Sequence, residues 1–328
     1  MIIDRYITYL KDIRRYSPRT VCIYEDVIRK YARKMSGSDD VSDDQLIGSL
    51  NTSELRSYEV SLMDEDGLLP KTVRLHMSAL SGFCGFLVKE GMLQSNPARL
   101  VPKPKVEKRL PHFYRKEVMD DYFSKTEIYS SKDFLELFQQ APHSDSGKDL
   151  YERRLGRLVL SLLYCTGLRR SELISLSIEN MDFGRKVAKV TGKGNKMREI
   201  PLIVSLCEEI LLYLRAVETL TGEERSLKSP LLVTYTGIPL YPAYVDRTVK
   251  RELGDVKGVT GRKSPHILRH SLATELMNDQ ADLNSIKEML GHSSLATTQV
   301  YTHSSFARLK NIYETAHPRA KNGGKHGD

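Results

Sequence analysis

The stretch Ser264-Pro265-His266-Ile267-Leu268-Arg269-His270 places two histidines and an arginine within five residues. Pro265 suits the first turn of a helix, where its missing N–H is not needed, so we expect a helix to begin there. His266 and Arg269 are then three residues apart and share one helix face, with His270 beside Arg269. A guanidinium can bind two phosphate oxygens at once, and an imidazole can carry a proton near neutral pH. The stretch therefore predicts a phosphate site.

A second arginine motif lies about a hundred residues upstream, in Thr166-Gly167-Leu168-Arg169-Arg170-Ser171-Glu172-Leu173. Gly167 can end the apolar helix that precedes it, which places Arg169 near the start of the next helix. Backbone amides at a helix start also favour anions. Glu172 follows Arg169 by three residues, so we expect its carboxylate to orient the Arg169 guanidinium.

A third motif, Gly291-His292, is followed by Tyr301 nine residues later. A phenol has a pKa near 10 and is a poor nucleophile unless cations or a base assist it. Two arginines, two histidines and a tyrosine could therefore break a phosphodiester without a metal or other cofactor. The competing interpretation is a zinc site, because His266 and His270 have HxxxH spacing. It is disfavoured because no glutamate lies between them and Arg269 would put a cation beside the metal.

The ordered set resembles the active site of the tyrosine recombinases, the family of phage integrases and Xer chromosome-dimer resolvases. The segments Thr166–Leu173, His266–His270 and Gly291–Tyr301 are similar to the three boxes of that family. Thr191-Gly192-Lys193-Gly194-Asn195-Lys196 resembles the turn that holds the family's catalytic lysine. Asn96-Pro97, the helical first hundred residues and the ending from Ala316 to Ala320 are also similar to Xer proteins.

The resemblance implies a role for each residue of the set. Arg169 and Arg269 would hold the scissile phosphate, and His292 would donate a hydrogen bond to it. His266 would act as general base and acid, Lys193 would protonate the departing 5′ oxygen, and Tyr301 would form a 3′-phosphotyrosine. Glu172 and His270 would support them. The implied partner is a duplex DNA recombination site, bound by a homo-tetramer, or a hetero-tetramer with a paralogue, that passes through a Holliday junction. An accessory DNA translocase or DNA-bending protein belongs to the same expectation.

Composition agrees with a nucleic-acid partner, since the 328 residues carry a net charge of +8. The length favours two domains. We predict a mainly α-helical protein with a small antiparallel sheet, arranged as a two-domain C-shaped clamp. Residues 1–100 would be a helical core-binding domain, 101–111 a linker, 112–320 a mixed α/β catalytic domain and 321–328 a disordered tail. Candidate DNA contacts are Lys11, Arg14, Arg15, Arg19 and Lys71 in the first domain, and Lys103 and Lys105 in the linker.

Local signals refine this picture. The proline-rich segment 101–111 should be extended, either as a solvated hinge or along a phosphate backbone. Residues 186–190 and 197–202 predict two strands around a glycine-containing turn, and residues 231–235 a further strand. Apolar residues at helical spacing predict an amphipathic helix over 305–315, of the kind that docks on a neighbouring subunit in this family.

The remaining features limit the cellular setting. Four widely spaced cysteines (Cys22, Cys84, Cys165 and Cys207) predict buried free thiols in a reducing cytoplasm, at the bacterial nucleoid. No apolar run approaches the roughly 20 residues that span a bilayer, and no signal peptide is evident. Two alternatives remain open: a type IB topoisomerase and a catalytically idle DNA-binding regulator. The sequence does not choose between integration or excision, inversion and dimer resolution.

Overall fold

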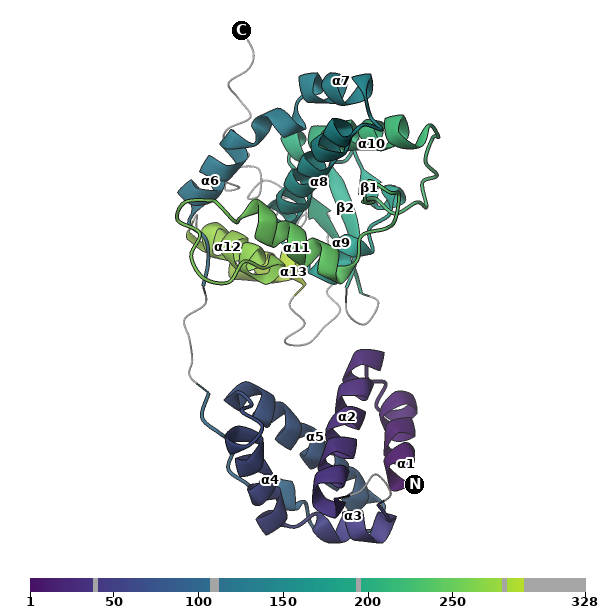
Figure 1. Cartoon of the computed structure of the whole chain (residues 1–328), viewed down its shortest axis with the longest axis vertical. Coiled ribbons are helices and arrows are strands. Elements are labelled where there is room, and N and C mark those ends of the chain that lie inside the picture. The colour runs from purple at the N-terminus through teal and green to yellow at the C-terminus, as the bar shows by residue number, and fades with distance from the viewer. Residues whose placement is uncertain (38–40, 107–111, 193–195, 279–281, 292–328) are drawn as a thin grey trace. The chain divides into compact units, whose positions relative to one another are not determined.

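The computed structural model describes residues 1–37, 41–106, 112–192, 196–278 and 282–291. The chain divides into two compact units, Met1–Arg109 and Leu110–Asp328 (Figure 1). Each unit has its own hydrophobic core. The two units are described separately below.

The described part of the first unit contains only helices as regular elements. They are α1 (Ile2–Thr8), the π-helix η1 (Tyr9–Ile13), α2 (Pro18–Ser36), α3 (Asp43–Ser49), α4 (Thr52–Asp64), α5 (Pro70–Lys89) and the 3₁₀ helix η2 (Pro97–Arg99). The start of α2 follows from its sequence: the Ser17 side chain accepts a hydrogen bond from the Thr20 N–H, and Pro18 fills the first turn. Gly37 ends α2 in the left-handed conformation, with φ 68°.

The core of this unit combines many aliphatic side chains with a few buried aromatic rings. Tyr31 and Tyr58 pack edge to face, with ring centroids 4.9 Å apart. Both are buried, and both hydroxyls are satisfied. Tyr31 donates to the Ser49 carbonyl at 2.7 Å, and the Tyr58 hydroxyl lies 3.1 Å from Nδ1 of His76. Burial of the rings therefore leaves no orphaned hydroxyl.

The second unit is a helical assembly around a small sheet. Its helices are α6 (Lys116–Lys125), α7 (Lys132–Gln140), α8 (Asp145–Thr166), α9 (Arg170–Ile174), α10 (Val204–Thr221), α11 (Pro242–Glu252), α12 (Pro265–Asn278) and α13 (Leu283–Leu290), with the 3₁₀ helices η3 (Glu127–Ser130) and η4 (Ile178–Asn180). The strands β1 (Met181–Asp182), β2 (Val187–Thr191) and β3 (Met197–Pro201) form an antiparallel sheet in the order β1-β2-β3. Thr191 pairs with Met197 at the end of the β2–β3 hairpin.

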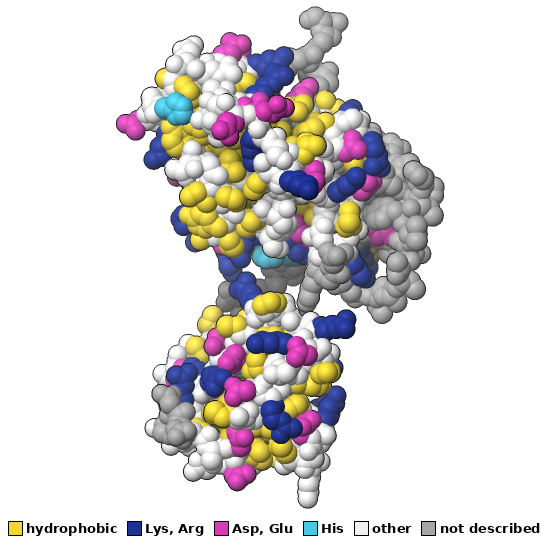
Figure 2. Space-filling model, turned by 90° about the vertical axis from the view of Figure 1, so that its right-hand side faces the viewer, with side chains coloured by type: hydrophobic (Ala, Val, Ile, Leu, Met, Phe, Trp, Pro, Cys, Tyr) yellow, Lys and Arg dark blue, Asp and Glu magenta, His cyan; other side chains and the backbone are white. Residues whose placement is uncertain are grey.

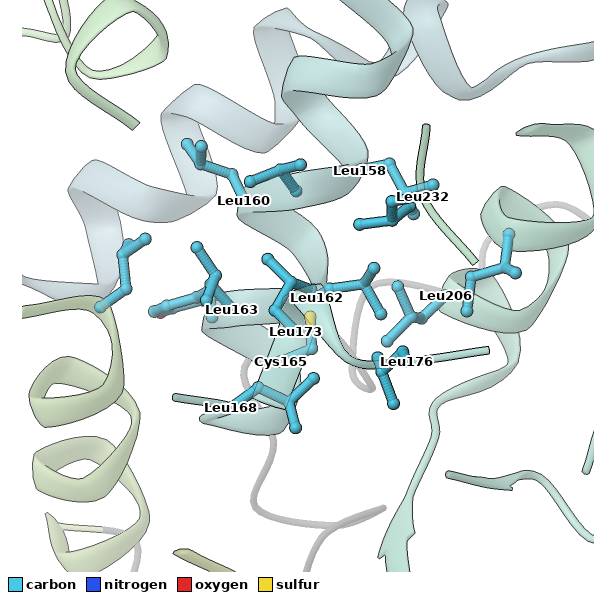
Figure 3. Packing of buried hydrophobic residues seen from close by; sticks show 14 of the residues in the cluster. Leu158, Leu160, Leu162, Leu163, Cys165, Leu168, Leu173, Leu176, Leu206 and Leu232 are labelled. Carbon is cyan, nitrogen blue, oxygen red and sulfur yellow. The ribbon is translucent and has the colours of Figure 1, made fainter. Parts of the chain in front are cut away.

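Helix α8 is the centre of this unit and packs against α10, α11 and α12 (Figure 1). It is buried nearly all round from Leu155 to Thr166. Leucines of α8 converge on leucines from other segments, such as Leu173, Leu206 and Leu232 (Figure 3). Each fully buried leucine contributes roughly 1.5–3 kcal/mol. This packing fixes the C-terminal end of α8, from which the segment that carries Arg169 extends.

Most of the predicted local structure is confirmed, and three points need correction. The predicted strands 186–190 and 197–202 are β2 and β3, but the short partner β1 was not anticipated. The predicted strand at 231–235 is wrong: only isolated bridges occur there, between Ser177 and Pro230 and between Val233 and Pro239. The chain turns back at once, as the Thr234 N–H donates to the Ile238 carbonyl. Pro239 has no N–H to extend the ladder.

The third correction concerns the cysteines. Cys84, Cys165 and Cys207 are buried free thiols, as predicted, but Cys22 is exposed. The buried face of α2 is set by Val27, Ile28 and Tyr31, and Cys22 lies off that face, where its thiol donates to Asp26 at 3.7 Å. In the described part of the chain, no helix is both long and apolar enough to cross a bilayer.

Candidate active site

Arg169 is held at the junction of α8 and α9. Gly167 ends α8 with φ 62°, which a glycine adopts without strain. Arg169 is the N-cap of α9, where its own N–H donates to Oε2 of Glu172 at 2.9 Å. Its guanidinium donates through Nη1 to Oε1 of the same carboxylate at 2.7 Å. Glu172 therefore fixes both the backbone and the side chain of Arg169.

A third arginine, Arg198 on β3, shares the same carboxylate. Its Nη1 donates to Oε1 of Glu172 at 3.0 Å and its Nη2 to Oε2 at 2.8 Å. Sequence reasoning missed this residue, although a signal was present. In β3, Arg198 and Ile200 alternate with the more exposed Met197 and Glu199, so the pattern places Arg198 on the buried face.

The C-terminal end of α13 binds all three guanidinium groups. Arg198 donates to the Met289 carbonyl at 2.8 Å. Arg269 donates to the carbonyl of the next residue, Leu290, and Arg169 to that of Gly291 at 2.6 Å. These are carbonyls without partners in the helix, at the negative end of its dipole. Three consecutive backbone oxygens therefore gather three arginines from distant parts of the sequence.

The charges in this cluster are unequal, with three guanidinium groups and one buried carboxylate, Glu172. Burial alone would raise the pKa of Glu172, but the hydrogen bonds and charges of Arg198 and Arg169 outweigh it and hold that pKa below its usual value. Burial, together with the charge of Arg169, lowers the pKa of Arg269 to about 10, which leaves it cationic at neutral pH. The surplus positive charge makes the cluster suited to an anion.

Helix α12 places the two predicted histidines beside this cluster. It begins at Pro265, as predicted. Arg269 is buried, and its Nη1 donates to the Gly167 carbonyl at 2.5 Å, whereas His266 and His270 are exposed. Burial, followed by the charges of His270 and Arg269, lowers the pKa of His266. A neutral, accessible imidazole is what a proton acceptor requires.

Three predicted site residues, Lys193, His292 and Tyr301, lie outside the described residues. Their attachment points are described. Gly192 and Lys196 flank the turn, and the Gly192 N–H donates to the Lys196 carbonyl at 2.8 Å. Gly291, which immediately precedes His292, contacts Arg169 directly. Within the described residues, no group of three or more His, Cys, Asp or Glu side chains is arranged to hold a metal ion.

Comparison with known proteins decides the family. Residues 133–308 match the phage integrase family, and residues 3–91 match the phage integrase N-terminal SAM-like domain. The chain belongs to the phage integrase family. It is 35% identical to the tyrosine recombinase XerC of Chlorobaculum parvum over 97% of this chain and 94% of that protein. It is 32% identical to XerC of Bacillus subtilis over 96% and 95%, respectively.

Solved structures of the same kind share the fold of this phage integrase family member. The XerH recombinase bound to a palindromic difH substrate matches with a TM-score of 0.61 and 19% identity, over 96% of this chain and 82% of that one. The Tn1549 transposon integrase in complex with transposon right-end DNA matches with a TM-score of 0.60 and 18% identity, over 98% and 97%. The predicted fold, mainly helical with a small antiparallel sheet, is therefore confirmed.

The seven predicted DNA contacts are all exposed in this family member: Lys11, Arg14, Arg15, Arg19, Lys71, Lys103 and Lys105. Arg19 and Lys71 lie in the first turns of α2 and α5. Arg14 follows η1 and stacks over the Tyr16 ring at 5.6 Å. On the face drawn in Figure 2, cationic and acidic side chains are interspersed over the first unit. Their exposure is compatible with a phosphate contact at each of the seven positions.

Proposed function

We propose that this protein is a site-specific recombinase that cuts and rejoins duplex DNA through Tyr301. The supporting observation is the cluster in which Arg169 and Arg269 are fixed by backbone carbonyls while Arg169 and Arg198 share one carboxylate. The cluster stands in a chain similar to XerC tyrosine recombinases over nearly its whole length. Such fixed cations stabilise charge that develops at a phosphate in the transition state.

The proposed reaction needs no external energy source. The Tyr301 oxygen attacks the scissile phosphorus and forms a P–O bond as the bond from phosphorus to the 5′ oxygen breaks. His266 takes the phenol proton, Lys193 gives a proton to the departing 5′ oxygen, and His292 donates to a non-bridging oxygen. A 3′-phosphotyrosine and a free 5′ hydroxyl result. Attack by a 5′ hydroxyl from another strand reverses each step and releases the tyrosine.

Arg169 is suited to contact the phosphate itself. The side chain of Arg169 is 31% exposed, although Nη1 and Nη2 each donate one hydrogen bond within the protein. A guanidinium has five N–H groups, so donors remain for an oxyanion. Arg269 would supply a second, more buried positive charge.

The assembly and biological role extend the same proposal. We expect the protein to act in the cytoplasm, at the nucleoid, as a tetramer on two paired DNA sites, alone or with a paralogue. An accessory DNA translocase or DNA-bending protein would assist it. Similarity to several XerC proteins over almost the full chain favours a Xer-type role over mobile-element integration. Resolution of a plasmid with two directly repeated sites would report that role.

The test is covalent capture on a labelled DNA site, followed by a denaturing gel. Wild-type protein should leave a protein–DNA adduct, whereas Tyr301→Phe should bind the same DNA and leave none, because only the nucleophilic oxygen is removed. Tyr129→Phe, at a tyrosine of η3 whose hydroxyl accepts from Arg153 at 3.1 Å, is the matched control and should still form the adduct. An adduct that persists in Tyr301→Phe contradicts the assignment. Rapid relaxation of a supercoiled plasmid that lacks the site would favour a topoisomerase instead.

A further inference from the structure

Within the described residues, the guanidinium group of Arg198 donates three hydrogen bonds, whereas those of Arg169 and Arg269 donate two each. Its three nitrogens donate to Oε1 and Oε2 of Glu172, at 3.0 and 2.8 Å, and to the Met289 carbonyl at 2.8 Å. These acceptors lie on α9 and at the end of α13, while Arg198 itself is on β3. One side chain thus joins three elements that are remote in sequence.

The burial of Arg198 separates its role from that of Arg169. Arg198 is only 8% exposed, and each of its nitrogens is already directed to an acceptor within the protein. A phosphate bound at the exposed edge of Arg169 would not need Arg198 as a ligand. Its contribution must therefore pass through the groups that it holds.

The neck of the β2–β3 turn, formed by Gly192 and Lys196, lies next to the Arg198–Glu172 pair. Gly192 lies so close that a Cβ at this position would sit 3.3 Å from Nη1 of Arg198 and 3.5 Å from Oε1 of Glu172. The Gly192 N–H closes the neck by donating to the Lys196 carbonyl, two residues before Arg198. The Gly192 end of the turn therefore lies against the Arg198–Glu172 ion pair, and the hydrogen bond to Lys196 ties the other end to it.

We propose that Arg198 is a positioning residue that sets the Gly192–Lys196 neck of the lysine turn relative to Arg169 and Arg269. Through Glu172 it is linked to Arg169, through Met289 to the end of α13, and through Gly192 to the turn. This inference rests on the proposed function, in which Lys193 protonates the 5′ oxygen. Loss of Arg198 should therefore impair protonation of the leaving group more than it impairs DNA binding.

The test compares two variants on two substrates. Arg198→Met removes the charge and all three hydrogen bonds, whereas Arg198→Lys keeps the charge for Glu172 but cannot reproduce the fork. Each is assayed on ordinary DNA and on DNA with sulfur at the 5′ bridging position, where a thiolate leaves without being protonated. We expect cleavage of ordinary DNA to fall about 10²-fold, the loss that small misplacements cause. The sulfur substrate should recover most of that loss.

The matched control is Arg185→Met. Arg185 also makes a two-pronged pair with a carboxylate on β3, at 2.9 Å from each oxygen of Glu199, but its side chain is 52% exposed. It should leave the sulfur-to-oxygen rate ratio at the wild-type value, and Lys193→Ala should raise that ratio most.

The outcomes distinguish the inference from the proposed function. An elevated ratio in Arg198→Met, or in Arg198→Lys if the methionine variant does not fold, supports a positioning role. Equal losses on both substrates, with an unchanged ratio, overturn it and reduce Arg198 to a structural ion pair. If wild-type protein forms no adduct on either substrate, the proposed function itself fails. If wild-type protein forms the adduct but Lys193→Ala leaves the ratio unchanged, Lys193 is not the general acid, and the part of the inference that concerns the turn fails with it.

Discussion

Replacing Glu172 by glutamine should destabilise the second unit more than any surface substitution. The carboxylate is 3% exposed and accepts four hydrogen bonds: two from Arg169, through its N–H and Nη1, and two from Arg198. Whichever oxygen becomes an amide nitrogen, two of those donors lose their acceptor. The variant also leaves three neighbouring guanidinium groups without their carboxylate.

The magnitude follows from these losses. Breaking a buried ion pair by removing one partner costs about 3–5 kcal/mol. For a unit of this size each kcal/mol lowers the melting temperature by about 2–4 °C, so Glu172→Gln should melt roughly 6–20 °C below wild type. The measurement is thermal unfolding followed by circular dichroism. Glu199→Gln, which breaks the exposed pair with Arg185, is the control and should cost about 0–1 kcal/mol.

The pH dependence gives a second, independent readout. The pKa of Glu172 is held below its ordinary value of 4.5 in the folded chain. Its charge therefore contributes its full stabilisation above pH 4.5, and this contribution is lost as the pH falls through the lower folded value. The stability gap between wild type and Glu172→Gln should narrow on acidification. A gap below 1 kcal/mol at neutral pH, or one that widens in acid, would refute the reasoning.

Three further outcomes are expected. Gly167→Ala should lower the melting temperature more than Gly222→Ala. Both glycines have a positive φ, but only at Gly167 would the new Cβ meet a side chain, 2.5 Å from Leu290. Equal losses of melting temperature would contradict the packing argument. The acid limb of the cleavage rate that belongs to His266 should lie below pH 6.5, because His266 must be neutral to accept a proton and its pKa is lowered. A limb above pH 6.5 that disappears in His266→Ala would contradict this. Deletion from Ser305 onward should spare binding to one site in gel shifts but impair strand exchange between paired sites, and full exchange by the truncated protein would dismiss the C-terminal docking segment.

The motifs of the candidate site could be located from the sequence because each coincides with a local structural signal. Gly167 marks the end of α8, Pro265 the start of α12, and Gly291 the end of α13. These signals depend on backbone geometry, which short stretches determine. The pairing of Arg169 with Glu172 is equally local, since three residues separate them.

The convergence of the arginines could not be obtained in the same way. Arg198 reaches Glu172 and Met289 across 26 and 91 residues of sequence, so no local pattern reveals the contact. The strand predicted at 231–235 failed for a related reason. A buried apolar run has the composition of a strand, but pairing requires a partner, and the chain turns back at Thr234 before one can form.

The bonds at the end of α13 limit how the length of this chain can vary. Each residue of an α-helix advances its carbonyl by about 100° around the axis. One residue inserted or lost between Asp282 and Gly291 would turn Met289, Leu290 and Gly291 away from their three guanidinium groups together. Relatives that retain this arrangement should therefore vary in length before Asp282 and keep α13 at constant length. The length of α13 thus determines whether its last carbonyls can bind the three arginines of the site at the same time.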